Sequence, residues 1–140
     1  MTTACYARVS TEDQDLSRQV RATLDYARDR LDATVDEDAG TVAAAVEDGS
    51  LASPIQLGEA TLFFDKSTGT DTSRAAFQAM LGDVDAGEFD AVVANSVSRI
   101  SRSIRDLDDT SKRIVDENGT ALHIISEGFD LLPDEDDPYQ

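Results

Sequence analysis

The sequence has 140 residues, of which 29 are Asp or Glu and 12 are Lys or Arg, giving a formal net charge of −17. This length suits one domain with a buried core, and no apolar run approaches the roughly 18 residues that cross a bilayer, so we expect no membrane contact and a cytoplasmic location. So acidic a chain also argues, on charge alone, against nucleic-acid binding, which draws its affinity from neutralised phosphates.

The first third of the chain predicts a strand followed by a helix. Residues 3–9 (TACYARV) predict a short buried strand. A helix from Glu12 to about Leu31 is predicted because apolar residues recur every three or four positions, at Leu16, Val20, Leu24, Ala27 and Leu31. Residues 11–14 have the form of a capping box, so we expect this helix to begin directly after Ser10.

The rest of the chain predicts alternating strands and helices after an irregular segment. Residues 35–60 are rich in Ala, Asp and Gly, and we interpret them as an insertion with a short helix at 41–47. Strands are predicted at 61–64, 89–94 and 121–125, helices at 74–86 and 103–117, and a frayed acidic tail at 133–140. This alternation predicts an α/β domain over residues 1–132, with three layers: a mainly parallel central sheet of four or five strands and helices on both faces.

Hydroxyl and basic side chains follow three of these strands. Ligands of parallel sheets bind beyond the carboxyl ends of the strands, where we expect the following residues to gather: Arg8, Ser10, Lys66, Arg74, Arg99 and Arg102. Guanidinium groups bind phosphate oxygens through paired hydrogen bonds, and a helix beginning after Ser10 would offer free N–H groups. The residues alone therefore predict an edge that binds phosphate.

Each of these residues also has a structural interpretation. Ser10 could be a helix cap, and Arg99 and Arg102 could form a solvated face paired with nearby acids. We expect Cys5 and His123 to be buried structural residues of their strands. The sequence contains neither a His/Cys cluster of the kind that binds zinc nor a phosphate-binding loop motif.

Three blocks of sequence resemble a known family, the serine site-specific recombinases of the resolvase/invertase type. Residues 6–11 (YARVST), with Gln14, Leu16 and Gln19, are similar to the family's opening signature. Residues 65–69 (DKSTG), followed by Arg74, resemble its second block, and residues 97–103 (VSRISRS) resemble a third block usually written LDRLGRS. The resemblance covers nearly the whole chain outside residues 35–60.

The resemblance implies a mechanism, residue by residue. Ser10 would be the nucleophile, forming a transient link to a DNA 5′ phosphate. Four arginines would hold that phosphate and stabilise its charge: Arg8, Arg74, Arg99 and Arg102. The remaining site residues would bind the substrate or shape its site, with Asp65 orienting the arginines: Tyr6, Gln14, Gln19, Asp65, Lys66 and Ser98. The family uses neither a metal nor a cofactor, and its full-length members bind DNA as homodimers or tetramers.

Two departures from the family leave alternatives open. Ser98 stands where the family usually has Asp, and we expect the chain to be truncated before the family's long dimerisation helix and DNA-binding domain. Both features favour a second hypothesis, a catalytically silent module with a regulatory or interaction role. A third hypothesis is a flavodoxin-like binding domain whose basic edge arose by chance.

The excess of acidic residues fits adaptation to high salt. Hydrophobic residues make up 40% of the chain in periodic patterns, which opposes disorder. Only two basic residues are lysines, and concentrated salt screens the self-repulsion of an acidic surface. We therefore expect a halophilic protein, similar to a recombinase of haloarchaeal type.

Overall fold

The computed structural model describes residues 2–10, 16–51, 53–67, 75–96 and 104–132. Those residues form four α-helices, a π-helical segment (η1) and six strands. In chain order they are β1 (Thr3–Ser10), α1 (Leu16–Arg30), α2 (Ala39–Glu47), β2 (Ile55–Leu57), β3 (Ala60–Ser67), α3 (Ala75–Asp85), β4 (Ala91–Ala94), α5 (Ile104–Ser111), η1 (Lys112–Glu117), β5 (Ala121–Ile124) and β6 (Phe129–Leu131). Among the described helices, none combines the length and the apolar character needed to cross a membrane.

The six strands form one sheet in the order β2-β3-β1-β4-β5-β6. The four inner strands are parallel, and the two outer strands, β2 and β6, run antiparallel to their neighbours. This confirms the predicted α/β class and mainly parallel sheet. The prediction of four or five strands missed the outer pair, because a strand of three residues is too short to show an alternating pattern.

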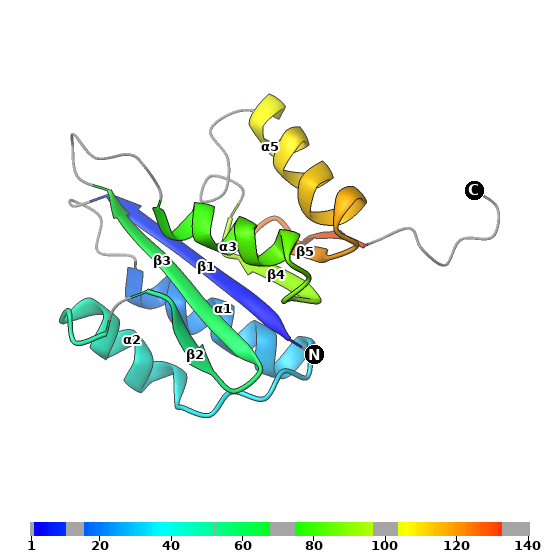
Figure 1. Ribbon diagram of the computed structural model, residues 1–140. Coiled ribbons are helices and arrows are strands. Elements are labelled where there is room, and N and C mark those ends of the chain that lie inside the picture. The colour runs from blue at the N-terminus through cyan, green and yellow to red at the C-terminus, as the bar shows by residue number, and fades with distance from the viewer. Residues whose placement is uncertain (1, 11–15, 52, 68–74, 97–103, 133–140) are drawn as a thin grey trace.

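Helices cover both faces of the sheet, as predicted. Helices α1 and α2 lie on one face, and α3 and η1 lie on the other (Figure 1). Successive residues of β1 point to opposite faces, so Ala4 and Tyr6 join the core beneath α3 and η1, whereas Cys5 and Ala7 join the core beneath α1 and α2. All four residues of β4 are buried, as expected for a strand covered on both faces.

The irregular segment at residues 35–60 completes the core beneath α1. Helix α2 begins two residues before the predicted helix, and Asp38 caps it by accepting a hydrogen bond from the Thr41 backbone N–H (3.1 Å). Its apolar face, together with Leu57 of β2, packs into the core shared with α1. A short amphipathic helix is thereby held by burial rather than by its own length.

The last long helix changes its form partway along. The predicted helix at 103–117 is α-helical over α5 but π-helical over η1. Near the end of η1, the Asn118 side-chain amide donates to the Arg113 carbonyl oxygen (2.7 Å) and to Asp85 of α3 (2.8 Å). Arg113 also forms a two-pronged ion pair with Asp85. These contacts hold the wider helical turn against α3, a feature that apolar spacing alone does not reveal.

Candidate active site

Ser10 is the last residue of β1, at the carboxyl edge of the parallel strands. The register of β1 and β3 pairs Ser10 with Ser67, Val9 with Lys66 and Arg8 with Asp65. The first two sequence blocks, separated by more than 50 residues, therefore meet at the same end of two adjacent strands. This is the edge at which ligands of such sheets bind.

The Asp65 carboxylate connects β1, β3 and α3. It accepts hydrogen bonds from the Tyr6 hydroxyl (2.7 Å) and from the backbone N–H groups of Ala76 (2.9 Å) and Phe77 (3.1 Å). The first N–H groups of a helix have no partner within the helix, and a carboxylate there is further favoured by the helix dipole. Asp65 therefore fixes the beginning of α3 against the end of β3.

Tyr6 lies within the core and helps to hold the Asp65 carboxylate in position. Its side chain is fully buried, and its ring lies 5.1 Å, centroid to centroid, from the ring of Phe77. A buried tyrosine hydroxyl needs a hydrogen-bond partner, which Asp65 supplies. A tyrosine in an apolar strand indicates a buried hydroxyl that needs a hydrogen-bond partner. The identity of that partner could not be predicted without the order of the strands.

Gln19 fastens helix α1 to the end of β1. Its side-chain oxygen accepts a hydrogen bond from the Arg8 backbone N–H, and its nitrogen donates to the Arg8 carbonyl oxygen, both at 3.0 Å. The amide thus pairs with Arg8 as a neighbouring strand would. Because Gln19 is fully buried on the inner face of α1, these bonds fix the backbone two residues before Ser10.

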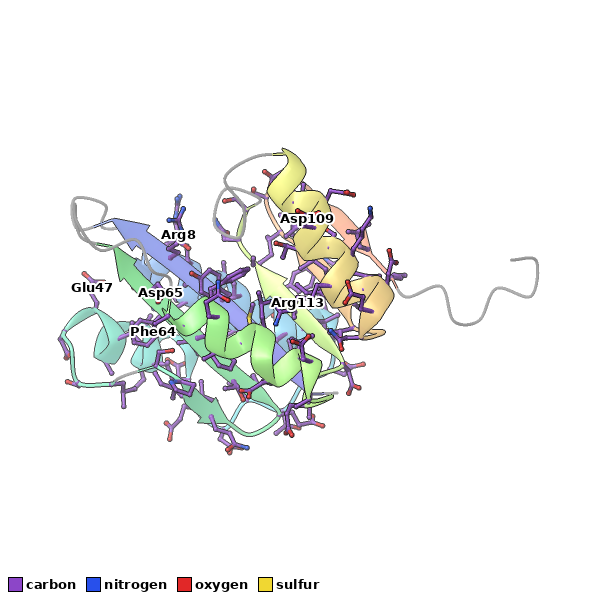
Figure 2. The ribbon with its side chains drawn as sticks, turned by 45° about the horizontal axis from the view of Figure 1, so that its top comes forward. Arg8, Glu47, Phe64, Asp65, Asp109 and Arg113 are labelled. Carbon is purple, nitrogen blue, oxygen red and sulfur yellow. The ribbon has the colours of Figure 1, made fainter. Side chains whose placement is uncertain are left out.

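The described residues bring four predicted site side chains to this edge: Tyr6, Arg8, Gln19 and Asp65. Tyr6 and Gln19 make internal hydrogen bonds that hold the ends of strands and helices in place. The partly buried Arg8 projects away from the sheet near the end of β1, and Asp65 lies beside the start of α3 (Figure 2). For Ser10 and Lys66 the backbone position is described. The other predicted residues lie outside the described residues: Gln14, Arg74, Ser98, Arg99 and Arg102.

Cys5 is a buried residue of β1, as expected. Its thiol lies 3.5 Å from the Thr23 carbonyl oxygen, and burial raises the pKa of the thiol to about 12. A thiol with such a pKa is protonated at neutral pH and is a poor nucleophile. Cys5 therefore does not compete with Ser10 as a candidate nucleophile.

The chain is similar in sequence to resolvases. The family described as "Resolvase, N terminal domain" matches residues 3–51 and 44–140. A resolvase of Clostridium perfringens (strain 13 / Type A) is 28% identical over 134 residues, which make up 96% of this chain and 53% of the relative. The chain thus spans about half the length of the curated relatives it matches.

Two solved structures share the fold. The N-terminal catalytic domain of TP901-1 integrase has a TM-score of 0.57 and 24% identity, covering 93% of this chain and 81% of that one. The C-terminal catalytic domain of ISC1926 TnpA, described as an IS607-like serine recombinase, has a TM-score of 0.58 and 19% identity, covering 89% and 67% respectively. At these identities the likeness is one of fold.

Proposed function

This chain belongs to the family of resolvase N-terminal domains, and on that premise we propose that it is the catalytic domain of a serine recombinase, in which Ser10 forms a transient bond to a DNA phosphate. The observation that supports this most directly is the position of Ser10. It ends the central strand β1, two residues after an arginine whose backbone is held by Gln19.

The proposed reaction exchanges one phosphodiester for another. The Ser10 oxygen attacks a backbone phosphorus and gives up its proton, while the bond from phosphorus to the 3′ oxygen breaks and that oxygen leaves as a hydroxyl. The DNA 5′ end is then held as a phosphoserine ester. Attack on this ester by the 3′ hydroxyl of another end reverses the bond changes and rejoins DNA. Because bond types are conserved, no external energy source is required.

Arginines supply the positive charge for this step in the proposal. We assign this role to Arg8, two residues before Ser10 on β1, and to Arg74, Arg99 and Arg102, which hold and neutralise the non-bridging oxygens as charge develops. Asp65 orients the start of α3, directly after Arg74, rather than binding DNA itself. Gln14, Lys66 and Ser98 complete the proposed substrate contacts, with the Ser98 hydroxyl acting where the family usually has a carboxylate.

We further propose that the full-length protein acts on DNA as a homodimer or tetramer in a salt-rich cytoplasm. The net charge of −17 makes the isolated surface repel DNA, except where the basic residues of the edge gather. Sequence readout needs an element that enters a groove. Recognition of a DNA site is therefore assigned to other parts of the full-length protein.

The proposal is tested by trapping the covalent intermediate. The protein that carries this domain is incubated with fragmented genomic DNA of its host in molar KCl and quenched in detergent, and DNA bound to protein is recovered. After digestion, mass spectrometry locates the phosphorylated residue. We expect the phosphate on Ser10. The Ser10→Ala variant should form no adduct but should bind DNA as tightly as the wild type, because the change removes an oxygen and no charge.

Matched variants distinguish the site from a general effect. Ser17→Ala removes a hydroxyl from the first turn of α1 and should leave the adduct intact, whereas Arg8→Ala should reduce its rate of formation by about 10². Arg21→Ala, which removes an exposed arginine from α1, is the control for Arg8. An adduct that persists in Ser10→Ala would refute the assignment.

A further inference from the structure

Strands β1 and β3 extend beyond both of their neighbours at the edge that carries Ser10. Their pairing with each other continues to the last residue of each strand. In contrast, β4 is paired with β1 only as far as Tyr6, and β2 is paired with β3 only as far as Leu62. Residues 7–10 of β1 and 64–67 of β3 therefore form a two-stranded ribbon. Because two strands alone are marginally stable in water, contacts on the outer sides of this ribbon determine how firmly Ser10 is held.

A side chain continues the hydrogen bonding on the side of β1 that faces β4. The Gln19 amide pairs with the N–H and the carbonyl oxygen of Arg8, both at 3.0 Å. Arg8 lies two residues beyond Tyr6, and alternate residues of a strand direct their backbone groups to the same side. Gln19 therefore extends the row of bonds that β4 forms with β1, and this side of the ribbon is held by α1.

Ser53 makes the corresponding contact on the side of β3 that faces β2. Its hydroxyl oxygen accepts a hydrogen bond from the Phe64 backbone N–H at 3.1 Å, two residues beyond Leu62. Phe64 directly precedes Asp65 near the carboxyl end of β3 (Figure 2). It is partly buried against the core beneath α1 and α2, where an N–H group without a partner would be costly. Ser53, just before β2, thus extends the bonds that β2 forms with β3.

We propose that Ser53 is a positioning residue for the Ser10 nucleophile, holding the β3 side of the ribbon as Gln19 holds the β1 side. This inference rests on the proposed function of Ser10. The register places Asp65, the residue after Phe64, beside Arg8. Without the bond from Ser53, the end of β3 separates more often from the end of β1. Ser10 is then aligned with the phosphate for a smaller share of the time, and its attack is slower.

Hydrogen exchange measured by NMR tests the Ser53 contact without reference to activity. In Ser53→Ala the Phe64 amide should exchange on the order of fivefold faster, because it loses its acceptor. The amides of Val92 and Val93 in β4 should keep their wild-type protection, which shows that the fold is intact. Ser53→Thr keeps the hydroxyl and should restore slow exchange. Ser50→Ala removes an exposed residue's hydroxyl from the same segment and should behave as wild type.

The rate at which the Ser10 adduct forms at saturating DNA tests the positioning role. Ser53→Ala should slow this rate about tenfold with DNA affinity unchanged, because attack depends on alignment, and Ser53→Thr should restore it. If Ser53→Ala loses β4 protection, Ser53→Cys is measured instead, since its sulfur is a similar size but a weak acceptor, and its rate should also fall.

The outcomes separate this inference from the proposed function. A wild-type rate in Ser53→Ala, or a Phe64 amide that still exchanges at the wild-type rate, would overturn the role of Ser53 and leave the function of Ser10 standing. A purely structural role would give faster exchange at Phe64 with an unchanged rate of adduct formation. A wild-type protein that forms no adduct on Ser10 would refute the proposed function, and this inference with it.

Discussion

Replacing Asp65 by alanine should destabilise the domain strongly, because one carboxylate satisfies three donors. Two of them are the backbone N–H groups of Ala76 and Phe77, and the loss of such a helix cap costs about 1 kcal/mol. The third is the buried Tyr6 hydroxyl, and leaving it without an acceptor costs about 1–3 kcal/mol. Because Asp65 is partly exposed and water can replace some bonds, we expect a total loss of about 3 kcal/mol.

A double-mutant cycle in urea isolates the contact between Asp65 and Tyr6. Tyr6→Phe alone should cost about 1 kcal/mol, since the carboxylate keeps its two backbone donors. In the double variant no hydroxyl is left without a partner, so its cost should fall below the sum of the single changes by about 1 kcal/mol. Asp83→Ala removes an exposed carboxylate from α3 and controls for net charge. Additive losses, or an Asp65→Ala variant as stable as this control, would refute the reasoning.

Three other expectations follow from the structure. Gln19→Leu removes both hydrogen bonds to the Arg8 backbone and should cost about 2 kcal/mol of unfolding free energy in urea, whereas Arg18→Leu on the exposed face of α1 should cost much less. The melting temperature should rise as KCl approaches about 1 M, where the screening length falls to about 3 Å; an unchanged value would contradict salt adaptation of a chain with charge −17. Because Cys5 is fully buried, thiol reagents should label it only as fast as the domain opens, and its pKa of about 12 keeps the folded thiol protonated; rapid labelling of folded protein would show that β1 is accessible.

The alternation of strands and helices could be predicted because long buried elements leave periodic patterns. Apolar spacing in α1 and the continuous apolar run of β4 each indicate one element and one pattern of burial. The three-residue strands β2 and β6 leave no such pattern, and their pairing depends on neighbours far along the chain. The π-helical segment η1 is also bonded to a distant residue, since Asp85, the partner of Arg113, lies 28 positions earlier in the chain.

The candidate site shows the same division between local and distant information. The position of Ser10 at a strand end followed from residues around it. The bond from Tyr6 to Asp65 joins residues 59 positions apart, and it requires β1 and β3 to be neighbours in register. Gln19 was expected in the site, but its pairing with the Arg8 backbone depends on how α1 packs against β1. The sequence could therefore predict which residues gather at the edge. It could not predict which of those residues hold the others in place through hydrogen bonds.

The π-helical segment also sets the rotation of α5 about its own axis. Thr110 and, in part, Leu107 face the body of the domain, whereas Asp108 and Asp109 face solvent. Figure 2 shows Asp109 and Arg113 along this helix. If all six residues of η1 formed a regular α-helix instead, every position of α5 would turn by about 100°. Thr110 would then take the solvent-facing direction of Asp109, and Asp108 would take the direction of the partly buried Leu107, where an unpaired carboxylate is costly. The wider helical turn of η1 thus determines which side of α5 the molecule presents to its surroundings.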